Sequence, residues 1–381
     1  MPRKKNVAQV FVSKSSKARP GPNICNLLAC TEKKGDIGIE IEVEGNKFPK
    51  DTSHSQVALI PKEWKYTKDG SLRGQDNAEY VLREPIKFEE VPGAVTKLWD
   101  MFSKYGSVLD ESNRTSVHVH LNVGRWHLNR LTSFLAMYFA VEEILTEWCG
   151  EHRVGNLFCL RAKDAPAIVT LLKRFIQNDG AVELPSSLHY AGLNANAIMK
   201  FGSLEIRSLR GCTDPQHILD WVAVLERIYN LSADFADPRA LVDSFSGNGP
   251  LAFYDMILGD RGPVVKESIT WDNQRIMESM YDGIRLAQDL CYCRDWSLYQ
   301  PVHIERDPFG RRKKVTTANM PILNTGLNQL EIHASAWADI PVSPQPIAAT
   351  SDLEDAGDYD EEEGGWGESE PDYDYDPEIF E

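Results

Sequence analysis

Three segments of this sequence, at 36–44, 117–123 and 203–209, alternate apolar and polar residues with a period of two. A β-strand points residues i and i+2 to the same side, so each segment predicts a strand with one apolar face and one polar face. These polar faces lack the usual mixture of Lys, Ser and Thr. They carry carboxylates in the first segment, imidazoles and an amide in the second, and a carboxylate beside an arginine in the third.

Other patterns predict the elements around these strands. A hairpin is expected over 64–83, with its turn at Asp69-Gly70-Ser71 and a fourth strand near Glu79. Apolar residues at helical spacing predict helices over 89–105, 128–148 and 166–176. Asp214 followed by Pro215 is typical of a helix start, and this helix is expected to run to about residue 234. A further helical region is expected over 265–295.

Charge divides the chain into regions. Residues 351–381 hold 15 Asp and Glu and no Lys or Arg, whereas residues 1–31 hold six basic residues and no acid. Because ends with charge of one sign stay solvated, we expect a basic disordered arm over 1–34 and an acidic disordered tail over 351–381. Between them we expect a folded core over 35–236. We expect residues 237–350 to form an extension, mixed and partly helical, that packs on the core.

Composition excludes several classes of protein. No apolar run approaches the length of a membrane span, and no apolar segment of a secretory signal follows the basic N-terminus. Seven cysteines without a CxxC spacing argue against a disulfide framework and a zinc ribbon. The sequence has no basic stripe, which argues against nucleic acid as a partner. We therefore expect a cytoplasmic protein that does not bind membranes. Its acidic tail, which is rich in aromatic residues, could bind a protein partner, and a homo-oligomer remains open.

The polar strand faces suggest a metal site. Carboxylates and imidazoles suit Mg²⁺ or Mn²⁺, and several neighbouring carboxylates would repel one another unless cations lay between them. An arginine two residues from a carboxylate can reach a phosphoryl oxygen with its guanidinium fork. The alternative is that these are ordinary solvent-facing sides of amphipathic strands. The side chains concerned are Glu40, Glu42, Glu79, His118, His120, Asn122, Glu205 and Arg207.

Several short segments, in their order along the chain, resemble a known family. They are Gly38-Ile39-Glu40-Ile41-Glu42, Asp69-Gly70-Ser71-Leu72 with Glu79-Tyr80, His118-Val119-His120, Tyr190-Ala191-Gly192-Leu193-Asn194 and Phe201-Gly202-Ser203-Leu204-Glu205-Ile206-Arg207. Over about residues 35–235 the chain resembles the phage and bacterial amidoligases. These belong to the carboxylate–amine ligase superfamily of glutamine synthetase and γ-glutamylcysteine synthetase. The resemblance implies an α+β fold with a curved antiparallel sheet of the glutamine-synthetase type, flanked by helices. It also implies that one face of this sheet binds ATP and Mg²⁺ or Mn²⁺.

The resemblance also implies roles for single residues. Arg207 would contact the transferring phosphoryl group or the bound carboxylate, and Glu79 could take the proton of the amine. His120 could bind a metal, or it could contact phosphate or substrate. An arginine for ATP is expected upstream of the third strand, and Arg161 is the first candidate, with Arg114 and Arg153 as alternatives. The implied metal ligands are Glu40, Glu42, Glu79, His118 and Glu205, and the implied cofactor-binding residues are Arg161, His120, Asn194 and Arg207.

The implied activity is ATP-dependent formation of an amide between a carboxylate and an amine, through an acyl phosphate. The substrates would be small molecules or peptides, and the protein would act in the cytoplasm, or in the host cytoplasm if it is viral. Two alternatives remain open. One is a catalytically silent protein of the same fold that binds or assembles with partners through its charged ends. The other is a metal-dependent kinase of a small molecule.

Overall fold

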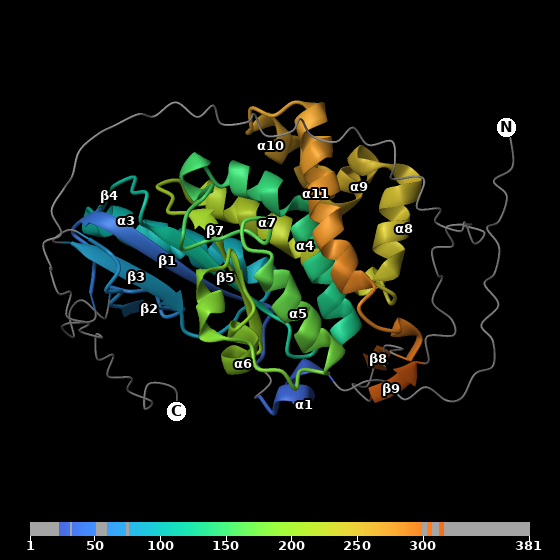
Figure 1. Ribbon diagram of the computed structural model, residues 1–381. Coiled ribbons are helices and arrows are strands. Elements are labelled where there is room, and N and C mark those ends of the chain that lie inside the picture. The colour runs from blue at the N-terminus through green and yellow to red at the C-terminus, as the bar shows by residue number, and fades with distance from the viewer. Residues whose placement is uncertain are drawn as a thin grey trace, which may run out of the picture. The chain divides into compact units, whose positions relative to one another are not determined.

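The computed structural model describes residues 23–30, 33–50, 59–73, 76–298, 303–306 and 312–315. These residues form an α+β fold built on a seven-stranded antiparallel sheet that does not close into a barrel (Figure 1). The strand order is β2-β3-β1-β5-β7-β6, and β4 pairs with the end of β1. The strands are β1 (Ile37–Asn46), β2 (Trp64–Thr67), β3 (Asn77–Leu82), β4 (Val108–Leu109), β5 (Ser116–Asn122), β6 (Leu193–Asn194) and β7 (Ser203–Arg210).

The register of the central strands aligns their polar positions. Glu40 of β1 lies opposite His118 of β5, and His120 of β5 lies opposite Glu205 of β7. On its other side β1 pairs with β3, where Glu42 lies opposite Glu79. Because the side-chain period of a strand is two, this register places the polar groups of four strands on one face and the aliphatic residues between them on the other. The period-two patterns of the sequence are confirmed.

Three helices cover the apolar face of the sheet: α3 (Val91–Tyr105), α4 (Leu128–Trp148) and α7 (Pro215–Leu231). Trp64 of β2 donates its indole N–H to the Ala94 carbonyl of α3 at 3.0 Å. The hydroxyl groups of Tyr138 in α4 and Ser208 in β7 lie 3.1 Å apart. The starts of these helices fit their sequences, because Pro215 follows an Asp214 cap that accepts the Gln216 N–H.

A second group of helices packs on the side of α4 away from the sheet. The helix α11 (Asn273–Cys291) runs along α4, and Figure 1 shows α4 between α11 and the strands. A Cβ at Gly283 would lie 2.7 Å from Ala140 Cα, so only glycine allows this approach. Burial from two sides explains why α4 is apolar around most of its circumference. The neighbouring helices are α5 (Ala167–Gln177), α8 (Arg239–Asn248), α9 (Pro250–Leu258) and α10 (Gly262–Glu267).

Short elements complete the described chain. The helix α6 (Ala197–Phe201) leads into β7, and β8 (His303–Arg306) pairs with β9 (Arg312–Val315). Single 3₁₀ turns lie at Phe88–Glu90, Glu151–Arg153, Ser186–Tyr190, Ser232–Asp234, Gly259–Arg261 and Trp296–Leu298. The extension expected over 237–350 is helical over α8–α11. Of this extension, residues 299–302, 307–311 and 316–350 lie outside the described residues, as do 1–22 and the acidic tail.

The ordered part of the chain begins earlier than we expected. We predicted that order starts near Gly35, but the helix α1 (Ile24–Leu28) precedes it. Ile24 is fully buried, and its N–H donates to the Trp126 carbonyl at 2.9 Å. A five-residue helix has little stability of its own, so this tertiary contact holds it in place. No local sequence pattern predicts such a contact.

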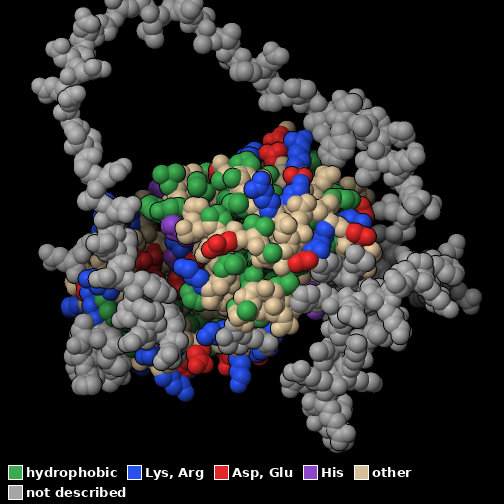
Figure 2. Space-filling model, turned by 60° about the horizontal axis from the view of Figure 1, so that its bottom comes forward, with side chains coloured by type: hydrophobic (Ala, Val, Ile, Leu, Met, Phe, Trp, Pro, Cys, Tyr) green, Lys and Arg blue, Asp and Glu red, His purple; other side chains and the backbone are tan. Residues whose placement is uncertain are grey.

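Two observations concern the helices and the surface of the described residues. None of their helices combines the length and apolar character that crossing a bilayer would need. On the face that Figure 2 presents, Lys and Arg side chains are interspersed with hydrophobic and acidic ones. The described residues of this face therefore form no continuous basic stripe of the kind that binds nucleic acid.

Candidate active site

The polar face of the sheet holds two groups of side chains that could each bind a cation. The first consists of Glu40, His120 and Glu205, from β1, β5 and β7. The second consists of Glu42, Glu79 and Asp69, from β1, β3 and the turn after β2. In each group the donor atoms, one from each residue, lie within 4.8 Å of one another. The sheet register therefore gathers residues far apart in the sequence on one face, as the sequence predicted.

In the first group, Glu205 is held from two sides. Its Oε2 accepts a hydrogen bond from Asn194 Nδ2 at 2.6 Å, and its Oε1 accepts one from Arg207 Nη1 at 2.5 Å. His120 Nε2 is buried 3.2 Å from Glu40 Oε1, without the alignment of a hydrogen bond. Its Nδ1 lies 3.3 Å from Ser203 Oγ. Asn194 and Arg207 thus lie beside the first group, as the resemblance implied.

In the second group, Glu42 is 5% exposed and is held by Ser116. Its Oε2 accepts both the backbone N–H and the hydroxyl of Ser116, each at 2.7 Å. Glu79 accepts a hydrogen bond from the Thr67 hydroxyl of the neighbouring strand. Asp69 Oδ1 accepts the Ser71 N–H at 2.5 Å, so the carboxylate that joins this group also closes the turn.

His118 lies between the two groups and is 5% exposed. Its Nδ1 is 3.1 Å from Glu40 Oε2 and 3.5 Å from Glu205 Oε1. Its Nε2 is 2.7 Å from Ser116 Oγ. We expected His118 as a metal ligand and left the role of His120 open. The structure places His120 in the first group, and it places His118 in hydrogen-bonding contact with Glu40 of the first group and with Ser116, which holds Glu42 of the second.

The two groups differ in their protonation. Burial would raise the pKa of Glu40, but the imidazoles of His120 and His118 outweigh it and hold this pKa well below its usual range. The pKa of Glu205 is lowered too, because His120 and Arg207 outweigh burial. In contrast, burial and the charges of Glu40 and Glu42 raise the pKa of Glu79 to about 7. Burial also raises the pKa of Glu42. In the second group, therefore, positive charge does not outweigh the effect of burial on Glu42 and Glu79.

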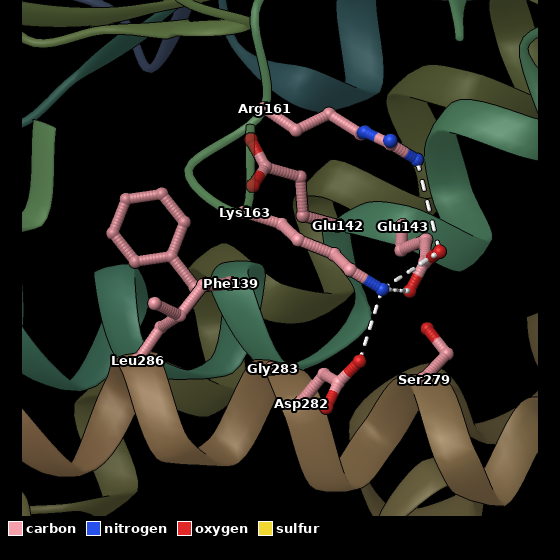
Figure 3. A pocket seen from close by; sticks show the side chains of 9 residues that line it. All are labelled: Phe139, Glu142, Glu143, Arg161, Lys163, Ser279, Asp282, Gly283 and Leu286. Carbon is pink, nitrogen blue, oxygen red and sulfur yellow. Dashed lines mark hydrogen bonds and ion pairs between the residues drawn. The ribbon is translucent and has the colours of Figure 1, made fainter. Parts of the chain in front are cut away.

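The structure does not bring Arg161 to either group. Its guanidinium binds Asp164 at 2.6 Å and lies 3.8 Å from Glu143 of α4, in a pocket between α4 and α11 (Figure 3). In the same pocket Lys163 bridges Glu143 and Asp282. The loop containing Arg161 packs against α4, because the Ala162 N–H donates to buried Glu142 at 2.8 Å. The sequence contained no signal for the direction of this loop.

The two alternative arginines have different surroundings. Arg153 is 4% exposed and donates to the carbonyls of Ser208 and Arg207 in β7, so it supports the strand that carries Arg207. Arg114 donates to the Ser71 carbonyl at 2.7 Å, in the turn that contains Asp69. Of the three arginines considered, Arg114 is therefore the one bound to a segment of the second group.

Two residues of this face were missed. Asp69 belongs to a segment that we quoted for the resemblance, but its place in an Asp-Gly turn concealed its part in a ligand group. Ser116 lies two residues before His118, so extending the period-two pattern by one step would have placed it on the polar face. Searches against protein-family models and against curated proteins found no match for this chain.

Proposed function

We propose that this protein is an ATP- and Mg²⁺-dependent ligase that joins a carboxylate to an amine through an acyl phosphate. One observation carries the proposal. Two groups of three oxygen and nitrogen donors lie on the same sheet face, linked through His118, with Arg207 bound to a member of the first group. Divalent cations beside an arginine are what enzymes use to handle the phosphates of a nucleotide.

The residues present fit a divalent cation. The first group offers two carboxylates and one imidazole, and the second offers three carboxylates; both sets suit Mg²⁺ or Mn²⁺. Burial raises the pKa values of Glu42 and Glu79, and the charges of neighbouring carboxylates raise that of Glu79 further, so a bound cation would favour their ionised forms. His120 Nε2 is buried without a hydrogen bond and faces the first group. Glu40, His120 and Glu205 would hold one cation, and Glu42, Asp69 and Glu79 a second.

Cations bound there would neutralise charge on the ATP phosphates and align them with the substrate carboxylate. The protein's own residues have separate tasks. Arg207 would donate to the transferring phosphoryl group, and its Nε, which is buried without a hydrogen-bond partner, offers a further donor. Asn194 fixes the orientation of Glu205. Glu79 could accept the proton of the amine only while it is not a ligand of the second cation, because a bound cation would lower its raised pKa of about 7.

The same set of residues would also serve a metal-dependent kinase, which forms a stable phosphorylated product instead of an amide. The other alternative, a silent protein that acts through its ends, concerns residues 1–22 and 351–381, which lie outside the described residues. The donor set described above gives us reason to place the catalytic hypothesis first.

Calorimetric titration of the full chain with Mg·ATP tests the nucleotide site. Wild type is expected to bind, and the double variant Glu40→Ala with Glu205→Ala is expected to bind at least about tenfold more weakly, because one donor group is lost. Glu44→Ala is the matched control, since Glu44 is on the same strand but in neither group. Equal binding by wild type and double variant would refute the site.

A second assay separates ligase from kinase. Pools of carboxylates and amines are screened for release of ADP, and hydroxylamine then replaces the amine. A ligase is expected to give a hydroxamate, because hydroxylamine captures an acyl phosphate. A phosphorylated product that persists in the presence of amines would instead identify a kinase.

A further inference from the structure

Two cysteines at the N-terminal edge of the described chain lie in contact. The sulfur atoms of Cys25 and Cys30 are 3.0 Å apart. Cys25 is in α1, and Cys30 follows the end of this helix. The Cys30 N–H donates to the Cys25 carbonyl at 3.1 Å, and Ala29 adopts a left-handed conformation with a φ of 53°. This helix end turns the backbone back on itself, so the two side chains meet.

Two glycines from other segments make room for these sulfur atoms. A Cβ at Gly124 would lie 2.5 Å from the sulfur of Cys25. A Cβ at Gly202 would lie 3.4 Å from the sulfur of Cys30 and 3.6 Å from that of Cys25. Gly202 also has a φ of 67°, which favours glycine independently of the space. The contact between the cysteines therefore sits in a cradle formed by the core, and it does not depend on α1 alone.

We propose that Cys25 and Cys30 are a redox-active pair that closes to an intramolecular disulfide. A disulfide requires an S–S distance of about 2.05 Å. The remaining approach is about 1 Å, which side-chain rotation can supply because the helix end already fixes both backbones. The other buried cysteines have different surroundings. Burial raises the pKa of the Cys149, Cys159 and Cys291 thiols, which disfavours the reactive thiolate.

A small-molecule disulfide such as oxidised glutathione would be the oxidant. Cys30 is partly exposed, whereas Cys25 is only 7% exposed, so Cys30 is the first to react with the oxidant. The Cys30 thiolate bonds to one sulfur of the oxidant and expels the other as a thiolate. The Cys25 thiolate then attacks the Cys30 sulfur and expels the second thiolate. Two protein thiols are oxidised, one small disulfide is reduced to two thiols, and the two protons pass to solvent or to the expelled thiolates.

The pair lies next to the end of the sheet that carries the first donor group. The Val123 N–H donates to the Gly202 carbonyl at 2.9 Å, and Ser203, the next residue, contacts His120. A disulfide would close the short loop from Cys25 to Cys30 at the end of α1 and would restrict this segment in the unfolded chain. We therefore expect the oxidised protein to have a higher Tm than the reduced protein.

The test uses the full chain in buffers of increasing ratio of oxidised to reduced glutathione. After acid quenching, alkylation and proteolysis, mass spectrometry is expected to find one Cys25–Cys30 linked peptide, with Cys149 and Cys291 recovered in alkylated form. Cys25→Ser is expected to lose the link and to collect glutathione on Cys30. Cys212→Ser, which changes a cysteine outside the pair, is expected to keep the link.

Wild type alone can refute the proposal, so the test does not depend on whether the variants fold. Recovery of Cys25 and Cys30 as thiols at the most oxidising ratio would overturn it. Recovery of Cys30 only as a mixed disulfide with glutathione would overturn it as well, since closure by Cys25 is the step that the geometry predicts.

Discussion

Binding of Mn²⁺ to this protein should strengthen as pH rises through neutrality. The pKa of Glu79 is raised to about 7 by burial and by the neighbouring carboxylates, and a cation binds only the ionised form. The fraction of ionised Glu79 rises from about one in eleven at pH 6 to about ten in eleven at pH 8, so affinity at the second group should rise about tenfold. The raised pKa values of Glu42 and His120 act in the same direction.

Calorimetry with Mn²⁺ at pH 6, 7 and 8 measures this dependence. At pH 7, binding should release about half a proton from Glu79, which appears as a dependence of the enthalpy on the buffer. Glu79→Gln should weaken binding at pH 8 and reduce the pH dependence. Glu44→Gln should leave both unchanged, because Glu44 lies outside the donor groups. An affinity of the wild type that is equal at pH 6 and pH 8 would refute the reasoning.

The same pKa has a consequence for the metal-free protein. A carboxyl group whose pKa is raised on folding stabilises the fold at low pH, and this contribution is lost as pH rises from the unfolded value of 4.5 through about 7. The metal-free protein should therefore have a lower Tm at pH 8 than at pH 6. Addition of Mg²⁺ should raise the Tm more at pH 8, since the cation binds the ionised carboxylates.

Three further predictions concern single residues. Burial raises the pKa of Glu142 to about 8, so its stabilising contribution is lost as pH rises from 4.5 to 8; relative to wild type, Glu142→Gln should gain about 3 kcal/mol more stability at pH 8 than at pH 5, and equal denaturant midpoints for variant and wild type at both pH values would contradict this. Asp69→Asn should lower Mn²⁺ affinity at the second group on the order of tenfold, and a calorimetric titration in which this group keeps its affinity would argue against it. Arg153→Ala should lower the free energy of unfolding in urea by about 2 kcal/mol, because two buried carbonyls of β7 lose their donor. It should also weaken Mg·ATP binding, because Arg153 supports the strand that carries Arg207. Wild-type behaviour in both assays would count against this role.

The strands and their polar faces could be predicted from the sequence because a strand has a short and fixed side-chain period. The pattern at 36–44 alone places Glu40 and Glu42 on one side of β1. Once the apolar sides are buried, a slip of one residue in the pairing would expose them, so the polar positions of β3, β5 and β7 stay on the same face as those of β1. The predicted convergence of Glu79, His118 and Glu205 followed from this local rule.

The positions that were not predicted depend on tertiary structure. The loop that holds Arg161 has no period, and its course is set by a hydrogen bond to Glu142, a residue 20 positions earlier in the sequence. The helix α1 exists because Ile24 is buried against a distant segment. Asp69 has a local task as a turn residue, and a turn can be predicted without knowing which strand its side chain will meet.

His118 makes the two donor groups dependent on each other. A neutral imidazole carries one N–H, which in this position can serve either Glu40 and Glu205 through Nδ1 or Ser116 through Nε2. A cation that takes the lone pairs of one group alters which ring nitrogen keeps the proton, and the other group then meets a changed partner. We therefore expect cation binding at the two donor groups to be cooperative, because both groups depend on which ring nitrogen of His118 carries the proton.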